Sequence, residues 1–413
     1  MFTDLIHEAY GAMQHNRKRA TLTMLGMAWG IATVILLLAY GSGFGVAIQH
    51  IFESFGAKVI AIFPGRTSMQ VGGAKAGAQI RLTVSDVERL AEAVPTIKHV
   101  TPELWKDANV QADNRSYQLQ VIGDNPSTQN IRVLKPAVGR FFNEEDNLQR
   151  ARVAVIGSEA KTKLFSGRYA VGETIRVDGI SFQVIGVLEP KMQEGDDNIN
   201  RIIYIPFLTA GDLKNSQYID AIWLDYEGMD WEKTEKMVRQ TLGAVHQFNP
   251  DDHRAIFLFN SMKQLNQFRV ITMGLKVLLA FIGTLTLGIG GVGLMNIMLV
   301  SVQQRTREIG TLKALGAKKR AILFQFLAEA LTISFAGGVL GTVLAYIVSF
   351  SVGRLTLYSA LAKNAEAGDL RLIIDPSNLL VATSILIVVG IVSGMLPAIK
   401  AARLSPIEAL RYE

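Results

Sequence analysis

The sequence predicts an α-helical membrane protein with four transmembrane helices and a large α/β extracytoplasmic domain of two subdomains, inserted between helices 1 and 2. Hydrophobic residues make up 49% of the 413 residues, and the mean hydropathy of +0.25 is high for a soluble protein. The excess is concentrated in four runs, each long enough for the roughly 20 residues that cross a bilayer. The stretch between the first two runs has the mixed composition of a soluble domain.

The four hydrophobic runs are predicted at residues 20–45, 269–300, 321–352 and 378–399. The first run follows a basic segment. It is longer than the apolar region of a signal peptide, which has roughly 7–15 residues, so we expect a membrane anchor there. Lys276 and Glu329 lie near span ends, where a long side chain reaches polar surroundings or faces another helix. The centres of the spans hold no charged residue of the kind that marks an ion path.

The basic residues predict the orientation of the chain. The loop at 301–320 is rich in positive charge, and further basic residues precede the first run and follow the last. Cytoplasmic loops carry such an excess, so we expect both termini (1–19 and 400–413) and this loop in the cytoplasm. Residues 46–268 and the mixed-charge loop at 353–377 are then extracytoplasmic. The net charge of +6 is thereby explained by membrane topology and does not indicate nucleic-acid binding.

Residues 2–14 carry apolar side chains at spacings of three and four, with polar residues between them. This pattern predicts an amphipathic helix. Two interpretations stay open: a helix in the cytoplasmic face of the membrane, or a helix packed on a partner protein.

The extracytoplasmic stretch shows an alternation of strand and helix patterns. Helices are predicted at 83–94, with Thr83 or Ser85 as its cap, and at 231–242. Asp178-Gly179 is a hairpin signal between two strands. Breaks near 206–217 and 249–253 suggest a second lobe at about 207–250. Strands are predicted at 58–63, 117–122, 152–156, 174–177, 182–188, 201–205 and 221–226.

No pattern of catalytic or metal-binding residues occurs in the sequence. The chain has no cysteine, its histidines lack metal-ligand spacing, and no Gly-x-x-x-x-Gly-Lys-Ser/Thr motif is present, so we expect no catalytic residue, metal or bound cofactor in this chain. The glycine-rich GIGGVG lies inside the second span, where it favours close helix packing or makes a flexible point in the helix. The residues predicted to act in helix packing are Gly288, Gly290, Gly291, Gly293 and Asn296.

The cytoplasmic loop contains a segment suited to docking on a partner. Residues 305–317 combine basic side chains with apolar ones at Ile309, Leu312 and Leu315, a spacing that predicts a short helix. Gly310 and Gly316 are expected to let this helix start and end sharply. Positive charge alone would orient the chain without that apolar spacing, so we favour a helix that docks in a groove.

Several motifs resemble the permeases of the MacB/FtsX/LolC superfamily of ABC transporters, over nearly the whole chain. The loop reads RTREIGTLKALGA from Arg305 after GGVGLMNIMLVSV, the C-terminus reads AARLSPIEALR from Ala401, and NRKRATLT begins at Asn16. GRFF at Gly139, RVAVIG at Arg152 and FQVIGV at Phe182 resemble the MacB-type core domain. One departure is Gln304, where the family often has an acidic residue; it puts a detail of docking in doubt.

The resemblance is closest to a MacB-type permease that lacks its own ATPase domain. It implies a permease without enzymatic activity of its own, a separate ABC ATPase that holds ATP and Mg, and a second permease copy or paralogue. It also implies a bacterial inner-membrane location, with a periplasmic adaptor and an outer-membrane channel as further partners. The residues expected to contact the ATPase are Arg305, Arg307, Glu308, Ile309, Gly310, Leu312, Lys313, Leu315 and Gly316.

In such systems ATP hydrolysis moves the helices and the periplasmic domain, which is called mechanotransmission. The expected function is export of a drug, peptide, siderophore or similar substrate. Two alternatives remain open from the sequence: a permease that extracts lipoproteins, and an FtsX-like regulator of a cell-wall hydrolase.

Overall fold

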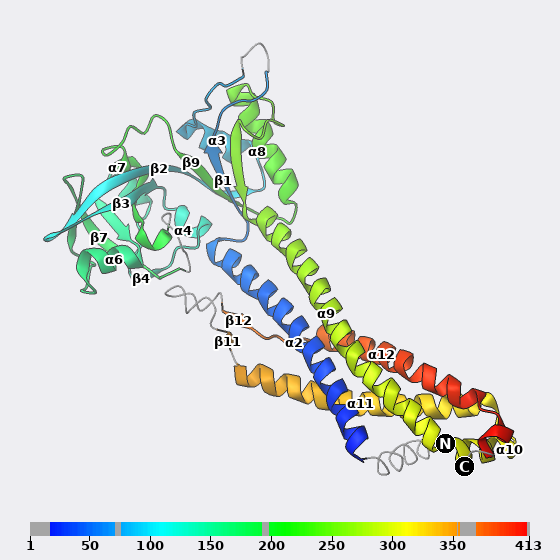
Figure 1. The fold of residues 1–413 in the computed structure, drawn as a ribbon. Helices are drawn as coiled ribbons and strands as arrows, with labels where there is room; N and C mark the ends of the chain where they lie inside the picture. The colour runs from blue at the N-terminus through cyan, green and yellow to red at the C-terminus, as the bar shows by residue number, and fades with distance from the viewer. Residues whose placement is uncertain (1–16, 71–75, 192–197, 353, 356–368, 411–413) are drawn as a thin grey trace. The chain divides into compact units, whose positions relative to one another are not determined.

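The computed structural model describes residues 17–70, 76–191, 198–352, 354–355 and 369–410 (Figure 1). The chain forms two compact units. We call the one that contains Ala47–Phe268 the α/β domain, and the one built from the long helices the helical unit. The predicted amphipathic helix at residues 2–14 lies outside the described residues.

Within the described residues, four helices are long and apolar enough to cross a membrane: α2 (Arg17–Phe55), α9 (Ser261–Gln304), α11 (Lys319–Val352) and α12 (Pro376–Arg403). They coincide with the four predicted runs. The helices α2 and α9 continue beyond those runs, to Phe55 and from Ser261, and so reach into the α/β domain. The helical unit also contains the short helices α10 (Thr306–Ala314) and α13 (Pro406–Leu410), and β11 (Arg354–Leu355) paired with β12 (Leu370–Arg371).

Small residues allow the long helices to approach one another closely. A Cβ atom added at Gly30 of α2 would lie 2.9 Å from Cα of Leu287 in α9, and one added at Gly337 of α11 would lie 2.8 Å from Cβ of Met27. Buried Ile31 and Ile35 of α2 pack into the same apolar cluster as Leu287. Figure 1 shows α11 and α12 running side by side. Close contact of this kind is how helices associate in lipid, where burial of apolar surface gives no advantage.

The α/β domain is organised around one ten-stranded sheet with the strand order β10-β1-β9-β2-β3-β8-β5-β7-β4, and β6 pairs with β2 and β7. The strands are β1 (Val59–Pro64), β2 (Ile97–Ala112), β3 (Arg115–Asp124), β4 (Pro136–Gly139), β5 (Val153–Ile156), β6 (Thr174–Val177), β7 (Ile180–Leu188), β8 (Ile203–Pro206), β9 (Ala221–Tyr226) and β10 (Ile256–Asn260). Because β1 follows α2 and β10 runs directly into α9, both long helices join the sheet at the β10–β1 end.

The long strand β2 holds the two halves of the sheet together. Its first part, Ile97–Glu103, pairs with β9, and its second part, Glu103–Ala112, pairs with β3. Pro102 lies just before the pairing with β3 begins, so its missing N–H costs no hydrogen bond to that strand. This strand is absent from the predicted set, because Pro102 and several charged side chains interrupt its apolar pattern.

Helices cover the sheet and close its core. Near β1, α3 (Val84–Ala93) packs on α8 (Trp231–His246), as Figure 1 shows. The remaining short helices are α4 (Thr128–Ile131), α5 (Glu144–Leu148), α6 (Ser158–Phe165), the 3-10 turn η1 (Ile199–Arg201) and α7 (Phe207–Ala210). One apolar cluster extends from Ile60 and Leu90 to Phe182 and Ile205. The division of this domain into two subdomains, with a second lobe at 207–250, stays a prediction.

Local signals in the sequence account for several elements. The hairpin predicted at Asp178-Gly179 is confirmed: Val177 pairs with Ile180, and φ is positive at both turn residues, as a two-residue turn of this hand requires. The cap predicted at Thr83 is also confirmed, since its N–H donates to Oδ2 of Asp86 at 2.8 Å. The strand predicted at 201–205 is wrong at its start, because Ile199–Arg201 forms η1 and β8 begins at Ile203.

A matched pair of glycines in α9 tests the helix packing. A Cβ atom at Gly291 would lie 2.7 Å from Cγ1 of Val389 in α12, whereas one at Gly293 would meet no atom within 4 Å. We expect Gly291→Val to lower stability by roughly 1–3 kcal/mol through overpacking, and Gly293→Val to change it little. Thermal unfolding of the two purified variants in detergent measures this. Equal melting temperatures would contradict the packing of α9 on α12.

Candidate functional site

The short helix α10 is packed firmly against the long helices through one face. It begins at Thr306, directly after α9 ends at Gln304. Ile309 is 2% exposed and lies in an apolar cluster with Val302 of α9, Phe326 of α11 and Ala398 of α12. Ile309 therefore packs within this chain and is not part of the exposed surface that a partner would meet.

One ion pair and two hydrogen bonds from a lysine strengthen this attachment. Nη1 of Arg305 lies 3.3 Å from Oε2 of Glu329 in α11, which confirms the interpretation of Glu329 as a residue that faces another helix. Nζ of Lys313 donates to the carbonyl oxygens of Ala402 at 2.7 Å and Leu404 at 2.5 Å, where α12 ends. Burial, and secondarily the charge of Lys319, lowers the pKa of Lys313.

Gly316 ends α10, as predicted. Its φ of +98° lies in the left-handed region that favours glycine, and the N–H of Ala317 donates to the carbonyl of Leu312 at 3.0 Å, which closes the helix end. The expected role of Gly310 at the helix start is wrong, because α10 already begins at Thr306 and Gly310 lies buried in its interior. Thr306 Oγ1 donates to the carbonyl of Val302 in the last turn of α9, at 3.1 Å.

The opposite face of α10 is exposed. Arg307 and Glu308 are exposed, and Leu312 and Leu315 are 42% and 84% exposed. The predicted docking residues thus separate into two groups. Arg305, Ile309, Gly310 and Lys313 hold the helix to its own chain, whereas Arg307, Glu308, Leu312 and Leu315 form a free surface with apolar and charged groups, which we call the docking face.

The residues predicted to pack the second span differ in their surroundings. Gly290 faces α2, where a Cβ atom would lie 3.1 Å from the carbonyl oxygen of Gly26, and Gly291 faces α12. Added Cβ atoms at Gly288 and Gly293 would meet nothing within 4 Å. Asn296 is exposed, so it does not pack against another helix of this chain.

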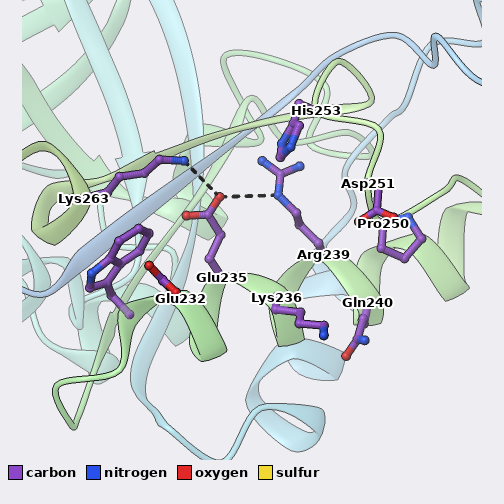
Figure 2. Close-up of a pocket in the computed structure, with 10 residues that line it drawn as sticks. Glu232, Glu235, Lys236, Arg239, Gln240, Pro250, Asp251, His253 and Lys263 are labelled. Atoms are coloured by element: carbon purple, nitrogen blue, oxygen red, sulfur yellow. Dashed lines mark ion pairs between the residues drawn. The ribbon is translucent and has the colours of Figure 1, made fainter. Parts of the chain in front are cut away.

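A cavity of about 570 Å³ lies in the α/β domain between α8, the loop before β10 and the first turn of α9 (Figure 2). Glu235 pairs with Nε of Arg239 at 3.5 Å and with Nζ of Lys263 at 3.6 Å. Three acidic and three basic side chains line it, so its lining has no net charge when His253 is neutral. The lining residues are Trp231, Glu232, Glu235, Lys236, Arg239, Gln240, Pro250, Asp251, His253 and Lys263. The four-residue spacing of Glu235 and Arg239 on α8 is the sequence signal for their pair, which was not among the predicted features.

A second charged group is buried where β2 passes from β9 to β3. Glu103 and Asp124 are paired residues of β2 and β3, and they are 1% and 0% exposed. Nη1 of Arg132 donates to Oε2 of Glu103 at 2.9 Å, and the guanidinium lies 4.3 Å from the centre of the Trp223 ring. Burial, and then the nearby Glu103, raises the pKa of Asp124 well above its usual range.

The described residues contain no cluster of His, Asp or Glu that could hold a metal ion. We take as the candidate functional site the docking face of α10, where apolar and charged side chains are exposed together.

The raised pKa of Asp124 predicts a pH dependence. Its carboxyl group binds a proton more tightly in the folded than in the unfolded chain, so its contribution to stability falls as pH rises above about 3.9. A difference of one between the two pKa values corresponds to about 1.4 kcal/mol. Asp124→Asn, which resembles the protonated form, should flatten this decline and be at least as stable at pH 7. Urea unfolding of the full chain between pH 4 and 8, followed by tryptophan fluorescence, checks it; identical pH slopes would contradict it.

Comparison with known proteins matches both parts of this architecture. The family model described as MacB-like periplasmic core domain matches residues 20–241, and the model described as FtsX-like permease C-terminal matches residues 280–406. The periplasmic region of MacB from Actinobacillus actinomycetemcomitans gives a TM-score of 0.44 at 22% identity, and the match covers 54% of this chain and 97% of that one.

Curated relatives are similar over almost the whole chain. The macrolide export ATP-binding/permease protein MacB of Bdellovibrio bacteriovorus is 34% identical, and the match covers 99% of this chain and 61% of the relative. The pyoverdine export ATP-binding/permease protein PvdT of Pseudomonas putida is 32% identical, with 99% and 59% covered. The chain thus spans about three fifths of the length of these relatives. By these matches, its four apolar helices and its periplasmic-type domain, the chain belongs to the MacB/FtsX-type family of ABC transporter permeases.

Proposed function

We propose that this chain is the permease of an ABC export system, in which ATP hydrolysis moves the α/β domain by mechanotransmission. The substrate would be a drug, peptide, siderophore or similar compound, since relatives are named for macrolide and pyoverdine export. ATP and Mg would bind to an ABC ATPase, because these 413 residues contain no P-loop motif. A periplasmic adaptor and an outer-membrane channel would complete the path.

The observation that carries this proposal is that α10 is attached to its own chain through one face and exposed on the opposite face. Its inner face is held by buried Ile309, by the Arg305–Glu329 pair and by the two hydrogen bonds of Lys313. A force applied to the docking face would therefore reach α9, α11 and α12 together instead of deforming a loose loop. The exposed Leu315 beside charged Glu308 gives a partner an apolar anchor with a polar rim, as binding sites commonly have.

The orientation follows from the charges around α10. Lys318, Lys319 and Arg320 are exposed directly after it, and cytoplasmic loops carry such an excess of positive charge. We therefore place α10 and both termini in the cytoplasm, where an ABC ATPase would bind, and the α/β domain in the periplasm.

We further propose that a second permease copy covers an exposed face of α9. Leu285, Ile289, Val292 and Asn296 follow one another at spacings of four, three and four, and the three apolar ones are 55%, 75% and 52% exposed. A polar amide facing lipid is unfavourable, whereas two such amides facing each other form hydrogen bonds between helices. Asn296 therefore indicates a second copy on this face rather than lipid.

Substitutions on the docking face test the ATPase contact. We expect Leu315→Asp and Glu308→Lys each to weaken binding of the cognate ABC ATPase by about 30-fold, equivalent to roughly 2 kcal/mol for a central contact. Stimulation of ATP hydrolysis should fall with binding. The measurement is a detergent pull-down with titrated ATPase, followed by an ATPase assay.

The control for these substitutions is Leu148→Asp, because Leu148 of α5 is 72% exposed but lies in the α/β domain. It should bind the ATPase like the wild type. Unchanged binding of both docking-face variants would remove α10 as the ATPase contact.

The second copy is tested by oxidation, because the chain contains no cysteine of its own. We expect Asn296→Cys to form a disulfide-linked dimer in membranes, since the same residue of each copy would meet near the interface. Val343→Cys, on the exposed side of α11 at 51% exposure, should stay monomeric on a non-reducing gel. Crosslinking of Val343→Cys alone would place the interface on another helix.

A further inference from the structure

The last turn of α2 belongs to the α/β domain, and Lys191 bonds its backbone there. Nζ of Lys191 donates to the carbonyl oxygen of Ser54, in the last turn of α2, at 2.7 Å. It also donates to the carbonyl oxygen of Arg132, the C-cap residue of α4, at 2.5 Å. We call this group of Lys191, Ser54 and Arg132 the clasp. One ammonium group thus bonds the carbonyl ends of two helices, where positive charge is favourable.

Further contacts surround the clasp. The ammonium of Lys191 lies 5.5 Å from the centre of the Phe55 ring. Gly56 directly follows α2, and a Cβ atom there would lie 2.6 Å from the carbonyl oxygen of Ile131, the last residue of α4. Figure 1 shows α4 beside the end of α2. The end of α2 is therefore seated against α4 and not separated from it by solvent.

From the clasp, contacts lead into both halves of the sheet. The side chain of Arg132 bonds Glu103 of β2 and lies against Trp223 of β9. The main chain of Lys191, which follows β7, exchanges two hydrogen bonds with Asn200 just before β8: its N–H donates at 2.8 Å and its carbonyl accepts at 2.5 Å. The lysine is thus anchored beside β7 and β8, which lie beyond β2 and β3 in the strand order counted from β1.

The strand order of the sheet shows what the clasp adds to the connection between α2 and the rest of the domain. Covalently, α2 and α9 enter the sheet at β1 and β10, so the hydrogen-bonded path from them to the far strands β8, β5, β7 and β4 runs through β9 and β2 and then through β3 or β6. The clasp supplies a second, direct connection between α2 and those far strands. Without it, the far strands could pivot about β2 and β3 when α2 moves.

We propose that the clasp transmits movement of α2 to the far strands of the α/β domain, with Lys191 as the positioning residue. The proposal rests on the proposed function, because it assumes that ATP hydrolysis moves α2. It assigns to these residues a role in mechanotransmission beyond holding the domain together.

The test of the clasp measures the distance between two spin labels, one at the same position of each permease copy. The full chain is used together with its ATPase. Single cysteines replace Gln49, exposed on α2, or Val138, exposed on the far strand β4. We expect the distance between copies to change with ATP at both positions in the wild-type background. In Lys191→Met, the change should persist at Gln49 and be lost at Val138, and Lys191→Arg, which keeps charge and donors, should restore it.

The matched control is Lys214→Met. Nζ of Lys214 also bonds a carbonyl, that of Trp105 at 3.0 Å, and pairs with Asp220, but it contacts only the sheet region. It should keep both distance changes. If Lys191→Met does not fold, Lys191→Gln carries the same test, because its shorter, uncharged side chain cannot bridge both carbonyls.

The outcomes separate the two proposals. ATP-dependent changes at both positions in Lys191→Met, equal to those of the wild type, would overturn the clasp and leave the proposed function intact. Loss at both positions in that variant would also overturn it, because the lysine would then act on α2 itself. Absence of any change in the wild type would overturn the proposed function, and the clasp with it.

Discussion

The strand β2 is the constraint on which the α/β domain depends. Its first part pairs with β9 and its second with β3, so a single strand joins two groups of strands that would otherwise be separate. At the point of transition lie two carboxyl groups, Glu103 and Asp124, with one guanidinium, that of Arg132. Burial, and then the nearby Glu103, raises the pKa of Asp124 well above its usual range, which favours the neutral form of that carboxyl group. The same Arg132 then connects this transition to α4.

In the helical unit, small residues let the long helices approach one another closely. Gly30, Gly337 and Gly291 each lie where a side chain would collide with a neighbouring helix. Helices packed at this distance move as a group more readily than they slide past one another, since their surfaces interlock. This is why the attachment of α10 matters: its contacts with α9, α11 and α12 involve three helices that are already packed together.

The features that follow from composition and local signals could be predicted from the sequence. Long apolar runs define the four helices, and Asp178-Gly179 defines a hairpin, because each signal is complete within a short stretch. The strand β2 could not be predicted in this way. Pro102 and the charged residues fit into it because the pairing with β3 begins just after Pro102, and no local pattern shows where that pairing begins. The spacing of Ile309, Leu312 and Leu315 predicted one docking surface, whereas Ile309 packs inward. Which side of a short helix faces its own chain depends on distant residues such as Phe326 and Ala398, and no local pattern encodes that.

Two lysines, one in each unit, make the same kind of contact. Lys313 bonds the carbonyls of Ala402 and Leu404 at the end of α12, and Lys191 bonds those of Ser54 and Arg132 at the ends of α2 and α4. In both cases burial is the largest cause of a lowered pKa, to about 8 for Lys191, because the ammonium has exchanged water for carbonyl oxygens. Carbonyls at a helix end have no partner within the helix, so an ammonium there satisfies groups that would otherwise need water. The contact therefore holds the helix through its backbone carbonyls. Replacing a side chain of that helix would leave these carbonyl oxygens in place.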